Sequence, residues 1–531
     1  MDTTPIEQRR DVGRLLLSGV VGSLPLIYRF ATHEPMHWEE LSHYLGAMQR
    51  ALDGQIVVKD FNFLFGPTLL WTLRRWMEVF GVGLASVTWF FMAGWSLFLV
   101  LLGIVVAQCS RSIVIAAVMC LIFSTFWMST SFDILASWGG PRYVPGVLVL
   151  ALGNEIIRRQ HSTSAAFRLS FFGGVLLPLA GSLSPEQVTI ALAAHVGGWL
   201  LLRRRAISAT TADVQTRSRC ALSCASGLML GTGLLLMAVP AGSLVQHLRE
   251  LPAYASWRQP LSEYAKDRVL FAVAMFLPAM TVYLMGLRRR GLRLTSGEDL
   301  VLIFGLFCAA QFVYALRAFQ HSQGLMATGY LLLFAGCLLQ RTWATSALRP
   351  IVSIIAAAYL AITVVVRAEA GRDALDRIVS NFSGVPVRCA TGCRESSASR
   401  LRGVWLPLAD ANALDAVLVG VRAEWRTTTD STYFVYPEDG FLEFALAHSA
   451  VGRFPVAALA NTKPEWRSQL LSVLAAAPPH IVVRRRTIGL FARSVGSKTE
   501  LLPEIAAFVA SNYIVFARGG QFEVLRHSSP R

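Results

Sequence analysis

The chain has 531 residues, of which 54% are hydrophobic and only 15% are charged, whereas soluble domains usually carry about a quarter charged residues. This composition excludes an ordinary soluble enzyme and predicts an α-helical protein that crosses a membrane many times. The net charge of +16 does not indicate nucleic-acid binding, because the basic residues fall in short clusters between hydrophobic runs. Such clusters also favour contact with anionic membrane lipids.

About eleven hydrophobic stretches along the first two-thirds of the chain suit a membrane-crossing helix in length. They lie near 14–30, 83–108, 112–130, 143–157, 169–183, 187–202, 220–241, 268–287, 299–316, 324–340 and 350–366. Arginine clusters at 158–159, 203–205 and 288–290 fall on one side when the chain is threaded through these spans. The positive-inside rule makes that side the cytoplasm. We therefore expect an inner-membrane protein with a cytoplasmic N-terminus and a long first outer loop at 31–82.

Residues 367–531 form a second predicted region, in which charge rises and no run of span length remains. Short β-type runs, STYFVYP, HIVVRRR, NYIVFARG and QFEVLRH, alternate with the helical stretches GFLEFALAHSA and PEWRSQLLSVLAAA. The pattern predicts a small α/β domain outside the cytoplasm, after a membrane domain at 1–366. Cys389 and Cys393 of RCATGC favour a local disulfide in an oxidising compartment over a zinc site, because no second ligand pair stands nearby.

The first outer loop carries the most informative motif, HWEELSHYLGAMQRALDG. Its apolar residues recur at helical spacing: Trp38, Leu41, Leu45, Met48 and Leu52. Glu39, His43 and Arg50 fall together on the opposite face. We expect a helix on the membrane surface whose acid, imidazole and cation face water. An ordinary solvated helix face is the alternative interpretation.

Polar residues gather in the segments predicted at the outer face. They are His33, Glu34, His37, Glu39, Glu40, His43, Asp60, Asp133, Arg142, Glu186, Arg317 and His321. A carboxylate beside arginines suits a reaction in which a hydroxyl attacks a carbon that bears a phosphate leaving group. The carboxylate would take the proton, and the arginines would hold the departing phosphate. In the competing interpretation, Arg142 and Arg317 only anchor helix ends at lipid headgroups.

A divalent metal remains open as a cofactor, since His33 and His37 stand four residues apart, as some metal ligands do. Pro35 lies between them and disfavours the helix that would place both on one face. The sequence contains no Gly-rich phosphate loop, zincin motif or nucleophile elbow. No cofactor is therefore assigned with certainty.

The layout of these motifs resembles the GT-C class of membrane glycosyltransferases, which includes bacterial lipid A sugar transferases and protein O-mannosyltransferases. EELSHYLGAMQRALDG followed by KDFNFLFGP is similar to the acidic first loop of that class and its aromatic, proline-containing end. The SLSPEQ loop and the run FVYPEDGFLEFALAHSAVGRFP are similar to its outer segments. Two features differ. Glutamate stands where the class has aspartate, and RAFQHSQ lacks the aspartate of an Arg–x–Asp segment.

The resemblance implies a glycosyltransferase that moves a sugar from a polyprenyl-phosphate donor to a lipid, glycan or protein acceptor at the outer face of the membrane. Glu39 takes the place of the catalytic aspartate, and Glu40 and Asp60 are the next candidates for the base. The expected substrate-binding residues are His43, Arg142, Glu186, Arg317 and His321, with Arg142 and Arg317 on the donor phosphate.

Two other functions stay open. A lipid or glycan transporter would need polar residues deep within its spans, often with broken or repeated helices. Here the polar residues gather at one face, which disfavours transport. A catalytically degenerate relative that acts as a binding or scaffold protein is the second alternative.

Overall fold

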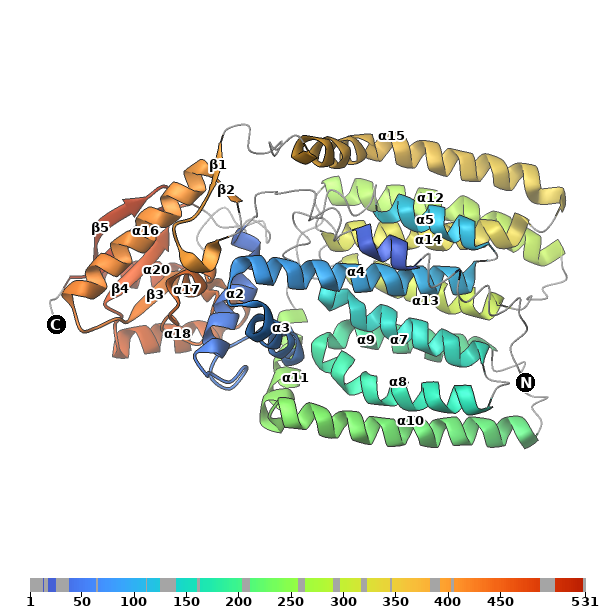
Figure 1. Cartoon of the computed structure of the whole chain (residues 1–531), viewed down its shortest axis with the longest axis horizontal. Helices are drawn as coiled ribbons and strands as arrows, with labels where there is room; N and C mark the ends of the chain where they lie inside the picture. The colour runs from blue at the N-terminus through green and yellow to red at the C-terminus, as the bar shows by residue number, and fades with distance from the viewer. Residues whose placement is uncertain are drawn as a thin grey trace.

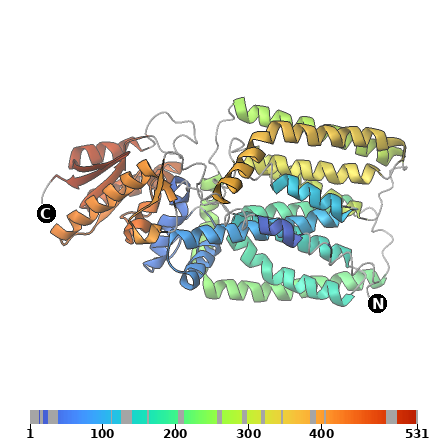
Figure 2. The same ribbon diagram turned by 45° about the horizontal axis from the view of Figure 1, so that its top comes forward.

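The computed structural model describes residues 13, 18–24, 38–63, 65–110, 112–124, 140–159, 163–202, 211–255, 263–289, 297–316, 322–343, 346–382, 392–402, 405–487 and 502–528. A bundle of long helices occupies one end of the molecule, and a smaller α/β domain occupies the other (Figure 1). The same division is visible after a turn of 45° (Figure 2).

Within the described residues, the bundle contains ten helices. They are α4 (Leu84–Cys109), α5 (Ile113–Ile122), α7 (Gly140–Arg158), α8 (Thr163–Leu183), α9 (Pro185–Leu202), α10 (Thr211–Ala238), α12 (Glu263–Arg289), α13 (Glu298–Ala315), α14 (Ser322–Trp343) and α15 (Arg349–Phe382). Each predicted span from residue 83 onward overlaps one of these helices, and of the span near 112–130 the structure describes only the part up to residue 124. Within the described residues, six helices are long and apolar enough to cross a membrane. The expected polytopic α-helical membrane fold is confirmed, and the count of about eleven spans stays a prediction.

Glycines allow a close helix contact in the bundle, between α8 and α10. A Cβ atom on Gly174 would lie 2.2 Å from the Cys224 carbonyl oxygen, and one on Gly227 would lie 2.1 Å from that of Phe171. No larger residue fits without separating the two backbones. Close backbone approach replaces the hydrophobic effect as the source of helix association in lipid.

The helices alternate in direction, so the bundle has two chemically different ends. At one end α7 finishes with Arg158, α12 finishes with Arg289, and α15 begins with Arg349. Arg341 holds this arginine-rich end together by donating to the carbonyl oxygens of Cys109, at 3.0 Å, and Gly297, at 3.3 Å. The opposite end faces the α/β domain (Figure 1).

Three further helices lie where the bundle meets the α/β domain: α2 (Trp38–Leu52), α3 (Pro67–Phe80) and α11 (Ala241–Ala255). Helix α2 packs on α17 (Phe441–Leu446) of the α/β domain. A Cβ atom on Gly46 would lie 2.8 Å from the carbonyl oxygen of Gly440, so the two backbones touch at these glycines. The part of the predicted polar face that holds Arg50 is therefore covered by protein and does not lie open on a membrane surface.

The α/β domain contains a four-stranded sheet in the order β3-β4-β6-β5. Its strands are β3 (Tyr433–Tyr436), β4 (Ile481–Arg485), β5 (Tyr513–Gly519) and β6 (Phe522–His527). Strands β3 and β4 are parallel, and the other two pairs are antiparallel. All four strands coincide with the predicted β-type runs, so the expected C-terminal α/β region is confirmed.

Alternate side chains of the sheet enter two different cores, as a period of two requires. Val435 and Val483 pack in the same core as α16 (Leu408–Thr427). Phe434 and Val482 face the other way, toward α18 (Pro464–Ala476) and α20 (Pro503–Asn512). The sheet is therefore covered on both faces, which explains why β3 reads as a continuous apolar run.

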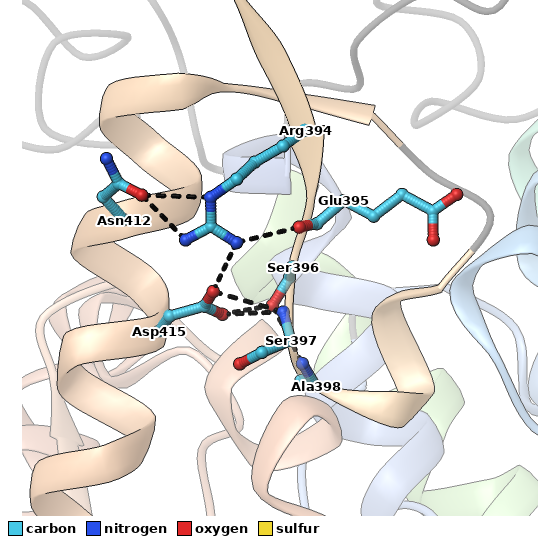
Figure 3. Close-up of polar contacts among 7 residues, drawn as sticks. All are labelled: Arg394, Glu395, Ser396, Ser397, Ala398, Asn412 and Asp415. Atoms are coloured by element: carbon cyan, nitrogen blue, oxygen red, sulfur yellow. Dashed lines mark hydrogen bonds and ion pairs between the residues drawn. The ribbon is translucent and has the colours of Figure 1, made fainter.

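A polar cluster fixes the start of this domain to α16 (Figure 3). It includes part of β1 (Cys393–Glu395), which pairs with β2 (Trp405–Pro407), and the residues directly after β1. Arg394 donates to Asn412 Oδ1 at 2.7 Å and pairs with Asp415 at 2.7 Å, and Asp415 also accepts from the Ser396 hydroxyl at 2.6 Å. Cys393 is disulfide-bonded. Cys389 lies outside the described residues.

Candidate functional site

Arg142, in the first turn of α7, joins three helices at the end of the bundle that faces the α/β domain. Its Nε donates to Glu186 Oε1 at 2.6 Å, and its Nη2 donates to the Tyr314 hydroxyl at 2.9 Å. Glu186 lies in the first turn of α9, where the helix dipole favours a carboxylate. Tyr314 lies in the last turn of α13. The Arg142 side chain is only 8% exposed, so this ion pair is largely shielded from water.

Aromatic residues of the first outer loop pack against this arginine. The guanidinium carbon of Arg142 lies 5.1 Å from the centre of the Phe65 ring, within cation–π range. The ring of Tyr44, on α2, stacks on Phe65 with centroids 4.8 Å apart and planes 3° apart. The loop and the bundle therefore build one site around Arg142, although Phe65 stands 77 positions before it in the chain.

One nitrogen of Arg142 is left for a ligand. Nε and Nη2 are engaged by Glu186 and Tyr314, and Nη1 makes no hydrogen bond to any residue that the structure describes. Guanidinium groups bind phosphate oxygens through such N–H groups. Glu186 balances the charge of Arg142, which lowers the cost of burying the cation.

His247 is a buried polar residue of the same region that sequence reasoning missed. It lies on α11, is 3% exposed, and neither ring nitrogen has a hydrogen-bond partner within the described residues. Burial lowers the pKa of His247, while the nearby carboxylates of Glu186 and Glu250 act to raise it. The balance favours a neutral imidazole. The segment QHLREL could have indicated a polar site around His247, because Gln246 and Glu250 stand one helical turn apart beside it.

Glu250 connects α11 to both the first outer loop and the α/β domain. Its Oε2 accepts from Asn62 Nδ2 at 3.2 Å, and its Oε1 accepts from Arg453 Nη2 at 2.7 Å. Arg453 also donates to the carbonyl oxygen of Val58 at 2.9 Å. The loop after α2 is therefore held between α11 and the α/β domain, beside the helix that carries His247.

A buried ion pair between Arg50 and Glu443 holds α2 itself. Nε and Nη2 of Arg50 donate to the two carboxylate oxygens of Glu443, each at 2.8 Å, and both side chains are 1% exposed. Arg50 also donates to the carbonyl oxygens of Ala450, at 3.1 Å, and Gly452. The expectation that Arg50 faces water is wrong, because the α/β domain covers that face of α2 and supplies the counter-charge.

The remaining candidates have different environments. Burial lowers the pKa of His43 to about 4, so it is neutral near pH 7. Asp60 is exposed, and its Oδ2 accepts from the Ile56 backbone N–H at 2.7 Å, which closes a local turn. Glu39 and Glu40 belong to the first turn of α2, but their side chains lie outside the described residues.

Arg317 and His321 also lie outside the described residues, as do His33, His37 and Asp133. Among the residues that the structure does describe, no group of three His, Cys, Asp or Glu side chains could hold a metal ion. Of the predicted site residues, the structure thus brings Arg142 and Glu186 into direct contact. Their roles stay predictions.

Comparison with solved structures identifies the fold. The chain is similar over 100% of both chains to ArnT from Cupriavidus metallidurans bound to undecaprenyl phosphate, with 13% identity and a TM-score of 0.51. It is also similar to the archaeal oligosaccharyltransferase AglB from Archaeoglobus fulgidus in complex with an inhibitory peptide and a dolichol-phosphate. That match has 11% identity and a TM-score of 0.53, and covers 99% of this chain and 75% of AglB.

No protein-family model and no curated protein sequence matches the chain. Both solved structures are GT-C glycosyltransferases, so the chain has a GT-C-like fold, as the motifs of the first loop indicate. At these identities the likeness establishes the fold alone.

Proposed function

We propose that this protein is a GT-C-type glycosyltransferase that moves a sugar from a polyprenyl-phosphate donor to a lipid, glycan or protein acceptor. The observation that carries the proposal is the contact of the buried Arg142 with the half-buried Glu186 and Tyr314, at one end of a multi-pass bundle of this fold. Phe65 of the first outer loop packs against Arg142. A phosphate linked to a membrane lipid would reach this cluster from the membrane. The two solved structures that share the fold were each determined with a polyprenyl phosphate bound.

Arg142 is the residue that we assign to the donor phosphate. Its Nη1 is available, and the aromatic face of Phe65 limits the directions from which a ligand can approach. As the sugar–phosphate bond breaks, the electron pair of that C–O bond goes to the phosphate oxygen. A fixed guanidinium stabilises this developing charge without having to reorganise.

Glu39, on the first turn of α2, is the residue that we assign as general base, with Glu40 and Asp60 as the next candidates. The acceptor hydroxyl attacks the anomeric carbon, and its proton passes to the carboxylate. Glu186 is less suited to this role, because its carboxylate already pairs with Arg142. Asp60 is less suited because its carboxylate closes a turn at an exposed position.

We place the site at the extracytoplasmic face of the inner membrane. The arginine-rich end of the bundle lies opposite the cluster around Arg142, and the positive-inside rule assigns an arginine-rich side to the cytoplasm. The α/β domain would then be extracytoplasmic, where the disulfide of Cys393 is stable.

The test is donor consumption by purified protein in lipid nanodiscs, supplied with a labelled pool of polyprenyl-phosphate sugars. We expect Arg142→Gln to lower turnover by about 10- to 150-fold, the equivalent of losing one charge-assisted contact of about 1.5–3 kcal/mol. Arg142→Lys should recover only part of it, because an ammonium cannot reproduce the guanidinium fork. Arg158→Gln, at the far end of the same helix, is the matched control.

Glu39→Gln, compared with Glu40→Gln, tests the base separately. Loss of a general base lowers the rate by about a hundred- to ten-thousand-fold. Normal turnover in the Arg142 and Glu39 variants would refute the assigned roles. Absence of any donor consumption by the wild-type protein, together with tight donor binding, would favour a scaffold, and movement of intact donor across the membrane would favour a transporter.

A further inference from the structure

A groove of about 500 Å³ lies between α5, α14 and α15, away from the cluster around Arg142. Its lining is almost entirely apolar and includes Met119, Leu332, Leu339, Ala356 and Leu360. Its volume falls in the range of about 300–1,000 Å³ that suits a small-molecule ligand. An apolar space of this kind is not a site for water.

The length of the groove is comparable to the thickness of one leaflet of a bilayer. Its lining runs over 112–123 on the α5 side, over 329–343 on α14 and over 352–363 on α15. At a rise of 1.5 Å per residue, these stretches are about 16–21 Å long. That is about half to two-thirds of the ~30 Å hydrocarbon core. The length therefore matches an acyl chain that enters from one surface and ends near the midplane.

Five lining residues carry a polar group, and of these Tyr359 and Thr363 lie farther along α15 while the other three mark the end that the chain enters. Ser112, Gln340 and Trp343 lie at the arginine-rich end of the bundle, where α5 begins and α14 finishes. Trp343 is 46% exposed, as is usual for a tryptophan at the level of lipid headgroups. Arg349, which is exposed, donates through Nε to the carbonyl oxygen of Trp343 at 3.2 Å and so stands at this entrance.

Helix α15 packs loosely on the bundle, which leaves the groove open on its lipid side. Only 11% of its apolar window is buried within the protein, and residues such as Ile354 and Val365 are largely exposed. A bilayer would cover these residues. A lipid chain in the groove would fill the space between α15 and α14 and contact both helices.

We propose that this groove binds one acyl chain of an anionic phospholipid from the leaflet at the arginine-rich end, with the lipid phosphate against Arg349. The cation at the entrance favours a negative headgroup, and the apolar lining takes the chain. This site is independent of the proposed transferase site, because Arg142 and Tyr314 lie at the opposite end of the bundle. The lipid would fix α15, which leads into the α/β domain.

The experiment is native mass spectrometry of the full chain released from nanodiscs of phosphatidylcholine mixed with phosphatidylglycerol. The wild-type protein should retain phosphatidylglycerol in preference to phosphatidylcholine. Ala356→Trp fills the groove and should abolish retention, whereas Ala357→Trp, exposed one residue along α15 and outside the lining, should not. Arg349→Gln should lower the preference for phosphatidylglycerol about fivefold. Arg168→Gln, on α8, is the control for charge.

A second measurement does not depend on any variant folding. Phosphatidylglycerol with a photoreactive group on its acyl chain should label peptides that contain 329–343 and 349–363 in the wild-type protein. Labelling elsewhere, or equal retention by Ala356→Trp and Ala357→Trp, would overturn the proposal. If undecaprenyl phosphate displaces the phosphatidylglycerol and Ala356→Trp slows donor turnover, the groove belongs to the donor and the phospholipid assignment is wrong.

Discussion

Replacing Glu443 by leucine tests the contact that ties the first outer loop to the α/β domain. The substitution removes both acceptors that face Nε and Nη2 of Arg50 and leaves the guanidinium buried, with only two carbonyl oxygens as partners. Removing one member of a buried ion pair costs about 3–5 kcal/mol. Since 1 kcal/mol shifts the unfolding midpoint of a domain of 150–250 residues by about 2–4 °C, we expect a fall of about 6–20 °C.

Arg50→Met should cost less than Glu443→Leu. Burial raises the pKa of Glu443 to about 7, and Arg50 opposes this rise, so the carboxyl left alone takes up a proton and becomes neutral. The double variant Arg50→Met, Glu443→Leu should recover most of the stability, because an apolar pair replaces the ion pair. Glu78→Gln breaks an exposed ion pair with Arg74 and should change stability by less than about 1 kcal/mol.

The pH dependence provides a second readout of the same contact. A folded-state pKa near 7, above the usual 4.5, means that the folded protein binds this proton more tightly than the unfolded chain does. The stability that Glu443 contributes is therefore complete below pH 4.5 and is lost as the pH rises through about 7. In Arg50→Met the loss should move to higher pH, and in Glu443→Leu it should disappear.

The assay is thermal unfolding in detergent, followed by tryptophan fluorescence, with hydrogen exchange of the α2 amides measured in parallel. Destabilisation should accelerate exchange in α2 before it affects the bundle. A midpoint for Glu443→Leu within about 2 °C of the wild type, or a larger loss for Arg50→Met than for Glu443→Leu, would refute this account of the contact.

Three further outcomes are expected. His247→Phe removes two unpaired buried nitrogens and should raise stability by about 1–3 kcal/mol in thermal unfolding; a loss of stability would contradict it. Partial burial acts to raise the pKa of Asp415, but hydrogen bonds from Ser396 and the charge of Arg394 hold it below the usual 3.8. Its stabilisation is therefore present above that pH and lost in more acidic solution, and Asp415→Asn should abolish this acid-dependent part of unfolding. A phosphatase fused after residue 531 should be active outside the cytoplasm, and cytoplasmic activity would overturn the orientation.

The sequence by itself determined the helices of the bundle and the strands of the α/β domain. A long apolar run such as 84–109 has few stable environments other than a membrane or a deep core, so its length identifies it. The strands β3 and β4 could be predicted from the sequence because their apolar, β-branched runs are short and end at turn signals. The polar residues Arg142 and Glu186 stood out because charge beside lipid is costly and therefore tends to be functional.

The contacts that the polar residues make can be seen only in the tertiary structure. The helical period of α2 separates an apolar from a polar face, but it cannot distinguish a face that meets water from one that meets a counter-charge. Arg50 meets Glu443, 393 residues later in the chain. His247 is buried near enough to feel the charges of Glu186, on α9, and of Glu250, on its own helix. Contacts of this kind depend on how the α/β domain docks on the bundle, and local sequence pattern carries no information about that docking.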